Sequence, residues 1–395
     1  MGKSVISKVI PRAYHDSVRL MQVSKELSNL DSVQRTFVAM GTDSNKRVLE
    51  QIGLLTDAVK DAGANDLIFV VEAKSKAIGE NALAKAEIVL SEGGKETVKN
   101  NKERLPQSFG QAYKVFQDAN MLFVSVPGAY AGLEAAKALN VNMNVMLFSD
   151  NVSLKDELRL KKIAKQKGLL LMGPGCGTAI INGIALGFAN VLNRGPVGVV
   201  GASGTGTQEF TTLLDRIGVG VSQVIGVGGR DLTDTIGGIM MKQGINMLAS
   251  DPSTELIVLI SKPPSINVIP KIMEEALASG KPVVVNFLGF KPSQKFENIY
   301  FTETIEDTAE AVHSIINKST DPFFVTKTSA LLEMAYNERA KFSKNQKYIR
   351  GLFSGGSLCD EAIDIFRRYS LEIYSNVETS KKWTLKNSQI SKEHS

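Results

Sequence analysis

The sequence predicts an α/β protein with tandem doubly wound parallel sheets, of the Rossmann and flavodoxin-like kinds, preceded by a small α+β domain. From about residue 119 onward, apolar runs of strand length alternate with helical patterns, and glycine-rich turns follow several of these runs. Strands that alternate with helices in this way form parallel sheets covered on both faces. The composition, 43% apolar and 22% charged over 395 residues, is that of a globular protein of two or three domains.

Residues 1–115 are expected to form the small α+β domain. Its strand and helix candidates are Val5–Ile10, Asp16–Leu30, Gln34–Met40 and Leu67–Glu72. The polar stretch 95–109, which contains Pro106, is expected to link this domain to the next.

Residues 116–192 are expected to form a Rossmann domain. Its candidate strands are Met121–Val126, Val141–Phe148 and Leu169–Met172. Helix Ala131–Leu139 follows the first strand. A second helix is expected after Ser153, which stands three residues before Asp156 in the spacing of a capping box.

Residues 193–318 are expected to form a complete flavodoxin-like domain. Its candidate strands are Pro196–Val200, Val221–Val227, Leu256–Ile260, Pro282–Phe287 and an edge strand near Tyr300. The helix Gln208–Gly218 carries one apolar face, and a further helix covers Ile305–Ile316.

The rest of the chain is expected to be less regular. Residues 319–349 are a charged connector, 350–378 are the incomplete start of a further α/β domain, and 379–395 are a disordered tail. Gly355-Gly356-Ser357 repeats the glycine turn that precedes a helix.

Composition excludes several classes of function. A net charge of +5 spread over the chain gives no reason to expect nucleic acid or membrane partners. Two Cys and three His predict neither a disulfide scaffold nor a metal site. No apolar run approaches the ~20 residues that span a bilayer, and the first residues do not resemble a signal peptide, so the cytoplasm is the expected location.

The glycine loop at 201–207 gives the sharpest functional signal. It follows a strand and opens a helix, and the N–H groups and dipole of a helix N-terminus favour an anion. Its G-x-x-G-x-G spacing fits a phosphate or carboxylate better than a dinucleotide, and no Walker A lysine follows. The alternative is tight packing of strand on helix by small residues. The anion-binding prediction covers Ser203, Gly204, Thr205, Gly206 and Thr207.

Loops after other strands extend this prediction, because ligands of doubly wound sheets bind at the carboxyl ends of strands. Gly228, Gly229 and Arg230 follow one strand and Lys262 follows the next, so that the two cations could neutralise an anion. Cys176, between two glycines, is expected to be a buried structural thiol. No catalytic residue is assigned.

Three stretches then indicate a family. MGPGCGTAIINGIALGFANVLNRGPVGVVGASGTGTQEF, GVGGRDLTD and SKPPS resemble the FdrA family of the acyl-CoA synthetase (NDP-forming) superfamily, over about residues 5–375. The chain looks C-terminally shortened beside that family. A more distant resemblance is to the α subunit of succinyl-CoA ligase, in which the counterpart of Gly201–Glu209 holds the phosphate of a phosphohistidine.

The resemblance implies a CoA-binding-like domain at 116–192 and a ligase-like domain at 193–318. It also implies a substrate or CoA-like pocket, made of Pro127, Gly128, Gly173, Pro174, Cys176, Gly177 and Thr178. The ligase has its phosphorylated His after the strand matching Pro282–Phe287, where this chain has Gly289-Phe290-Lys291-Pro292. Lys262 falls near the position of the Glu that orients that His, so phosphohistidine chemistry has no carrier.

FdrA-type proteins are associated with purine (allantoin) catabolism and with oxamate carbamoyltransferase activity. The resemblance therefore implies transfer of a carbamoyl or acyl group from its phosphate, in an enzyme of several subunits or a homo-oligomer. An NDP-forming acyl-CoA ligase subunit and a non-catalytic regulatory subunit are the alternatives. The expected ligands are small anions such as acyl or carbamoyl phosphate. No cofactor is assigned, and CoA and a nucleotide remain open.

Overall fold

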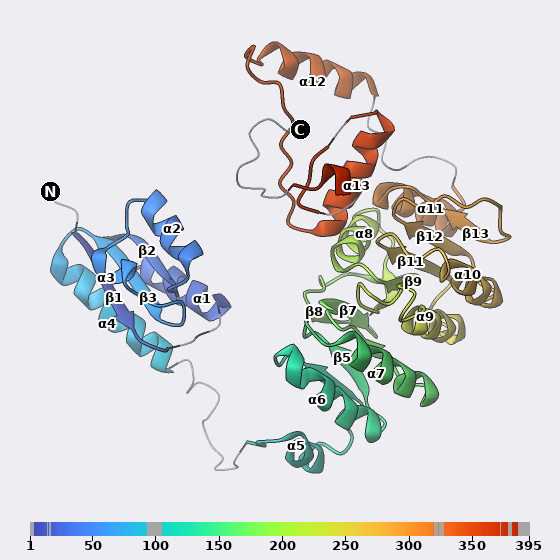
Figure 1. Ribbon diagram of the computed structural model, residues 1–395, viewed down its shortest axis with the longest axis horizontal. Helices are drawn as coiled ribbons and strands as arrows, with labels where there is room; N and C mark the ends of the chain where they lie inside the picture. Colours follow the sequence, from blue (N-terminus) through green and yellow to red (C-terminus); the bar gives the residue numbers. More distant parts are fainter. Residues whose placement is uncertain are drawn as a thin grey trace. The chain divides into compact units, whose positions relative to one another are not determined.

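The structure, a computed structural model, describes residues 4–13, 15, 17–92, 105–319, 323, 328–371, 373–377 and 381–385. It divides into two compact units, 1–105 and 106–395 (Figure 1). The first unit ends at residue 105 rather than at the expected boundary of 115. Helix α5 (Phe109–Val115) belongs to the second unit because Phe109 and Tyr113 pack against that unit's core.

The first unit is a three-stranded antiparallel sheet in the order β1-β3-β2. Its strands are β1 (Ser4–Ile10), β2 (Val33–Met40) and β3 (Leu67–Ala73), and its helices are α1 (Ser17–Ser28), α2 (Asp43–Gln51), α3 (Asp57–Lys60) and α4 (Lys76–Glu92). The strands predicted from the sequence are confirmed.

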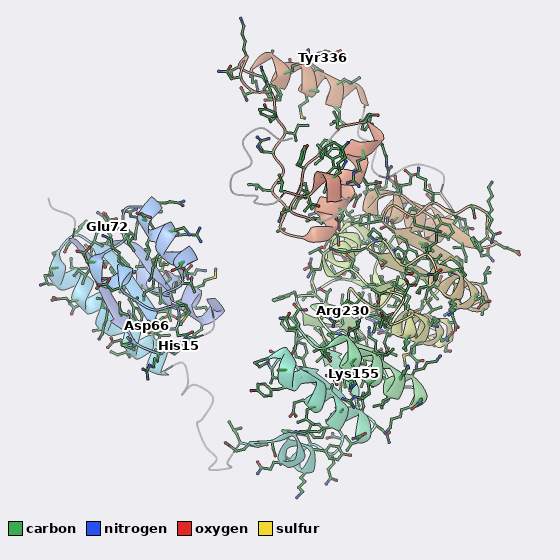
Figure 2. The ribbon with its side chains drawn as sticks, viewed as in Figure 1. His15, Asp66, Glu72, Lys155, Arg230 and Tyr336 are labelled. Atoms are coloured by element: carbon green, nitrogen blue, oxygen red, sulfur yellow. The ribbon has the colours of Figure 1, made fainter. Side chains whose placement is uncertain are left out.

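Helices cover both faces of this sheet, so β3 is buried along its whole length. Phe69 and Val71 join a core with α1 and α4, and Ile68 and Val70 join a second core with α2 and α3. Glu72, also buried, forms an ion pair with Nε of Arg35 at 2.6 Å (Figure 2). Alternate side chains of one apolar run thus serve two cores.

The second unit begins with a small parallel sheet in the order β4-β5-β6. Its elements are β4 (Met121–Val124), α6 (Gly128–Asn140), β5 (Asn144–Leu147), α7 (Leu154–Gln166) and β6 (Leu171–Met172). Ser153 caps α7 as its spacing predicts, since its Oγ accepts a hydrogen bond from the Asp156 amide at 3.1 Å.

A seven-stranded sheet follows, in the order β13-β12-β11-β9-β10-β7-β8. Its elements are β7 (Thr178–Ile181), β8 (Ile184–Gly187), β9 (Arg194–Gly201), α8 (Gly204–Arg216), β10 (Val221–Gly226), α9 (Ile239–Ser250), β11 (Leu256–Ser261), α10 (Ile269–Ala278), β12 (Val283–Phe287), β13 (Ile299–Phe301) and α11 (Ile305–Asn317). Strands β9 to β13 are parallel and have the flavodoxin-like order, so the predicted doubly wound fold is confirmed.

The β7–β8 hairpin belongs to the larger sheet and not to the smaller one that precedes it. Strand β7 pairs antiparallel with β10, and Ile180 of β7 is buried in the core beneath α8 and α11. The larger sheet therefore begins before residue 193.

The larger sheet is covered on both faces (Figure 1). Phe210 and Leu214 of α8 share a core with Ile305 and Val312 of α11 on one face. On the other face, α9 and α10 pack in a core that continues into the smaller sheet.

The C-terminal part contains α12 (Thr328–Ala340), α13 (Gly356–Arg368) and a 3₁₀ turn at Lys381–Trp383. The stretch 351–354, which precedes the glycine turn, pairs with no strand among the described residues. Ser375 forms a bridge with Thr384, which corrects the expected disorder for 381–385; residues 386–395 lie outside the described residues. Tyr336 on α12 is exposed (Figure 2).

No helix among the described residues is long and apolar enough to cross a membrane.

Candidate anion-binding site

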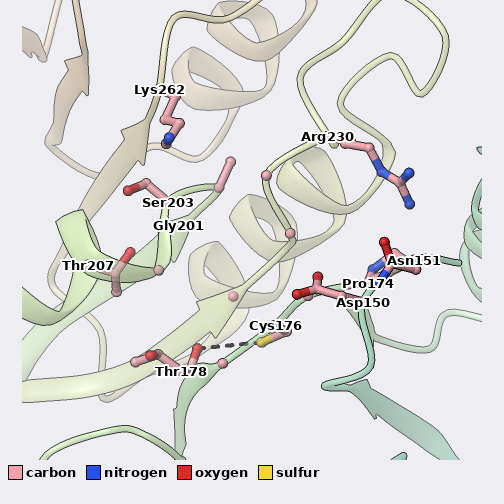
Figure 3. A pocket seen from close by; sticks show the side chains of 17 residues that line it. Asp150, Asn151, Pro174, Cys176, Thr178, Gly201, Ser203, Thr207, Arg230 and Lys262 are labelled. Carbon is pink, nitrogen blue, oxygen red and sulfur yellow. Dashed lines mark hydrogen bonds between the residues drawn. The ribbon is translucent and has the colours of Figure 1, made fainter. Parts of the chain in front are cut away.

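A pocket of about 460 Å³ lies at the carboxyl ends of β9, β10 and β11, where the strand order of the flavodoxin-like sheet reverses (Figure 3). The loops after β5 and β6 form the opposite wall. The lining residues are Asp150, Asn151, Pro174, Gly175, Cys176, Gly177, Thr178, Gly201, Ala202, Ser203, Gly204, Thr207, Gly226, Gly228, Gly229, Arg230 and Lys262.

The first turn of α8 forms one side of this pocket. Ser203 is the N-cap, and its Oγ accepts a hydrogen bond from the Gly206 amide at 3.1 Å. Thr207 lines the pocket and is only 2% exposed, and its Oγ1 has no hydrogen-bond partner among the described residues. A buried hydroxyl without a hydrogen bond costs free energy of folding, unless a ligand or water supplies the missing bond. The predicted loop therefore supplies a polar group that is ready for a ligand.

A second helix N-terminus reaches the same turn. Ser357, in the first turn of α13, lies with its Oγ 2.5 Å from the Oγ of Ser203. A Cβ on Gly355 would stand 2.4 Å from Cγ2 of Thr205, so the two helix starts are in close contact. Two positive dipole ends meet at this point, an arrangement that favours an anion between or beside them. Sequence reasoning identified the second glycine turn but not its contact with the first.

The two predicted cations stand at different places in the pocket and each has a carboxylate partner. Lys262 lies near Ser203, and its Nζ is 3.4 Å from Oδ2 of Asp360 on α13. Arg230 points away from Ser203, toward Asn151 (Figure 3). Each cation therefore has a carboxylate partner as well as a place in the pocket lining, and the expectation that the two neutralise an anion stays a prediction.

Arg230 is the outer member of a buried ionic network. Its Nη2 is 2.7 Å from Oε2 of Glu157 and donates a hydrogen bond to the carbonyl of Val152. Oε1 of Glu157 is 2.9 Å from Nζ of Lys161, which in turn is 2.8 Å from Oδ1 of Asp231. Glu157, Lys161 and Asp231 are fully buried. The network joins α7, beside the smaller sheet, to the loop after β10.

The loop after β6 closes the pocket on the other side. Gly228 has φ +84°, and a Cβ there would lie 2.5 Å from the carbonyl oxygen of Pro174, so only glycine allows this approach. Cys176 is buried under the contact, and burial raises the pKa of its thiol to about 11. The structure thus gives Cys176 the surroundings of a structural thiol.

The pocket differs from the predicted residue set in two ways. Five predicted residues do not line it: Pro127, Gly128, Gly173, Thr205 and Gly206. Six lining residues were not among the predicted site residues: Asp150, Asn151, Gly175, Gly201, Ala202 and Gly226. Asp150 follows strand β5, so the rule that sites lie at strand ends could have identified it. Its carboxylate forms no hydrogen bond or ion pair with the described residues and points into the pocket (Figure 3).

Comparisons with known proteins identify the family. The uncharacterized protein YahF of Escherichia coli (strain K12) is 44% identical over 393 residues, which are 99% of this chain and 75% of YahF. The chain belongs to the family of YahF, within the acyl-CoA synthetase (NDP-forming) superfamily. The succinate–CoA ligase [ADP-forming] subunit alpha-2, mitochondrial, of Trichomonas vaginalis is 35% identical over 150 residues, 37% of this chain. The chain covers 47% of that subunit, about half its length.

Two family models match the YahF-like chain. The CoA binding domain model matches residues 193–289, and the model described as the AllF heavy metal-associated domain matches residues 3–106. Residues 116–192, which were expected to be CoA-binding-like, lie outside the range that the CoA binding domain model matches. A solved ATP citrate lyase (D541A mutant) of Methanosaeta concilii, in complex with (3S)-citryl-CoA, has a TM-score of 0.44 at 15% identity and covers 63% of this chain and 48% of its own.

The two models name a heavy metal and CoA as ligands, and the residues of this chain fit these two groups differently. Residues 3–106 contain no cysteine, and the described residues hold no group of three or more His, Cys, Asp or Glu that could bind a metal. The described residues therefore do not offer a heavy metal a set of ligands. A phosphate group of CoA fits the first turn of α8, where Thr207 leaves a buried hydroxyl without a partner.

Proposed function

We propose that this chain is an FdrA-type subunit that transfers an acyl or carbamoyl group between a phosphate and a small acceptor anion, in a complex with partner subunits in the cytoplasm. The observation that carries the proposal is the first turn of α8, which opens onto the pocket with the buried hydroxyl of Thr207. No described residue forms a hydrogen bond with this hydroxyl. Helix N–H groups and a buried hydroxyl suit the phosphate of an acyl phosphate.

The chemistry needs a leaving phosphate that is stabilised and an acceptor held beside it. The N-termini of α8 and α13, with Lys262, would stabilise the charge that develops on the leaving phosphate. Binding both reactants in one pocket supplies their orientation. This route requires no phosphoenzyme, and the described lining of the pocket contains no histidine.

A carboxylate that could receive a proton also belongs to the proposal. Glu209 and Asp231, the acids nearest to the glycine loops in the sequence, do not line the pocket, and Asp231 is bound to Lys161. Asp150 does line it, and its carboxylate has no partner in the described part of the chain. Asp150 is therefore the group that we propose to accept a proton from the acceptor substrate.

The alternative is an acyl-CoA ligase subunit. The CoA binding domain model covers residues 193–289, which include Ser203, Arg230 and Lys262, and the named relatives include succinate–CoA ligase subunits. CoA carries phosphates that the same helix N-terminus could hold. The two functions share a phosphate site and differ in the second reactant.

The experiment compares Gly204→Val with the matched variant Gly110→Val. Both glycines lie in the first turn of a helix and have no atom within 4 Å of an added Cβ, but only Gly204 lines the pocket. Calorimetry should show that Gly204→Val weakens inorganic phosphate binding about tenfold or more, because the side chain blocks approach to the N–H groups, while Gly110→Val binds like the wild type. Undiminished binding in Gly204→Val would move the site elsewhere.

The reaction is then tested with two mixtures, each with the natural partner subunits. The proposal expects phosphate release from carbamoyl phosphate and oxamate, lost in Gly204→Val. Turnover only with succinate, CoA and ATP would establish the ligase. Phosphate binding without turnover in either mixture would leave a regulatory subunit.

A further inference from the structure

Arg230 has N–H groups left for a ligand after its internal contacts are made. Only its Nη2 is engaged, by Glu157 at 2.7 Å and by the Val152 carbonyl at 2.9 Å. The side chain is 41% exposed and lines the pocket. No described residue is bonded to its Nε or Nη1. A guanidinium with free N–H groups in a pocket is suited to a carboxylate.

The buried network holds the Arg230 side chain in place. Its four members, Arg230, Glu157, Lys161 and Asp231, carry two positive and two negative charges. Asp231 also accepts hydrogen bonds from the amides of Met240 and Met241, the first turn of α9, at 3.2 and 2.9 Å. These amides share the charge of Asp231, so Lys161 is left to neutralise Glu157. Arg230 is then only partly neutralised.

Arg230 is also separated from the phosphate site. Its side chain points toward Asn151, whereas Ser203, Thr207 and Lys262 lie together on the other side of the pocket (Figure 3). One small anion at the first turn of α8 would use Lys262 and leave Arg230 without an anionic ligand.

We propose that Arg230 forms a second anion subsite, specific for a carboxylate, and that Glu157 positions it. This inference rests on the proposed function and names the second reactant as a small carboxylate, bound beside the phosphate. Glu157 is a positioning residue because it contacts Arg230 and, being fully buried, does not reach the ligand.

The test titrates the full chain with oxalate, with and without saturating inorganic phosphate. Wild-type protein should bind both together. Arg230→Met should weaken oxalate about tenfold or more and phosphate less than about twofold. The matched control is Arg159→Met, since Arg159 is 49% exposed, is paired with Asp156 and does not line the pocket; it should leave both affinities unchanged.

Two further variants test the positioning role. Glu157→Gln keeps an oxygen that can accept from Arg230 but removes the carboxylate charge that competes with the ligand. Oxalate should then bind about threefold more tightly, and its affinity should depend more steeply on salt concentration. This gain should vanish in the double variant with Arg230→Met. Arg230→Lys keeps the positive charge but loses the two parallel N–H donors of the guanidinium, so its affinity for oxalate should lie between those of the wild type and Arg230→Met. If Arg230→Met does not fold, Arg230→Lys and Glu157→Gln replace it in the test.

Three results would overturn the subsite. They are displacement of oxalate by phosphate, equal weakening of both anions by Arg230→Met, and no effect of Arg230→Met on oxalate. Failure of the proposed function is distinct, because phosphate would then not bind to the wild type while the oxalate titrations could still be interpreted.

Discussion

The thiol of Cys176 lies in the pocket wall but is only 3% exposed, because the loop that carries it packs over Gly226 and Gly228. Burial is the main cause that raises its pKa to about 11, and a backbone hydrogen bond of Thr178 opposes this rise. At neutral pH the group is therefore a protonated thiol, which is a poor nucleophile.

This burial predicts a loss of stability in alkali. The pKa of Cys176 is higher in the folded state than its ordinary value near 9.0, so its contribution is fully present below pH 9 and is lost as the pH rises to about 11. Urea denaturation should show the free energy of unfolding falling by roughly 2–3 kcal/mol more in the wild type than in Cys176→Ala. Equal pH dependence in the two proteins would contradict the burial of this thiol.

Residue by residue, the sequence predicted the part of the site that follows from local pattern. Ser203 and Thr207 stand in a strand–glycine–helix pattern whose geometry is known in advance. Glu157 could not be assigned to Arg230, because the pair depends on how α7 packs beside the loop after β10. The free carboxylate of Asp150 needed the same tertiary information.

At the scale of elements, α13 is attached to the starts of α8 and α11 and to the loop after β11 by specific contacts. Besides the Ser203–Ser357 contact, Oε1 of Glu361 accepts a hydrogen bond from the Ile305 amide at 3.1 Å, and Lys262 pairs with Asp360. Burial raises the pKa of Glu361. The sequence predicts only loose docking for 352–373, because a single strand–helix unit cannot bury its own apolar face. The described residues of α13 instead make these defined contacts.

Substitution of Gly355 should undo this docking. In Gly355→Ala the new Cβ would stand 2.4 Å from Cγ2 of Thr205, so α13 must move away from α8. Hydrogen exchange should show faster exchange of the α13 amides, by about tenfold or more. Leu352→Ala, at a side chain that is 99% exposed, is the control and should exchange like the wild type. Unchanged protection in Gly355→Ala would mean that the contact is not needed.

Element prediction succeeded where periodicity was regular. The strands β9 to β12 each combine an apolar run with a following turn, and their bounds match the expectation within a few residues. The β7–β8 hairpin was missed, although Asn182 and Gly183, with φ +52° and +82°, form a turn that an Asn-Gly pair predicts. Its membership in the larger sheet depends on the pairing of β7 with β10, which no local pattern specifies.

For the whole molecule, each compact unit has its own buried cores, and the flavodoxin-like sheet of the second unit carries the pocket. Within that unit, His313 lies on α11, where its ring centroid is 5.4 Å from that of Phe323, and it does not line the pocket. The stretch Gly289–Pro292, which follows β12, contains no histidine. Among the described residues, the pocket therefore has no nitrogen nucleophile of the phosphohistidine kind in its lining.

This arrangement predicts that the chain takes no phosphate from a nucleotide. Incubation with labelled ATP or GTP, Mg²⁺ and the natural partner subunits should leave no acid-labile, base-stable label on it, because covalent catalysis needs a nucleophile within reach of the bound phosphate. A succinate–CoA ligase α subunit treated in the same way is the positive control. Stable label mapped to His313 would require α11 to present that side chain to the pocket, and would favour the ligase over transfer without a phosphoenzyme.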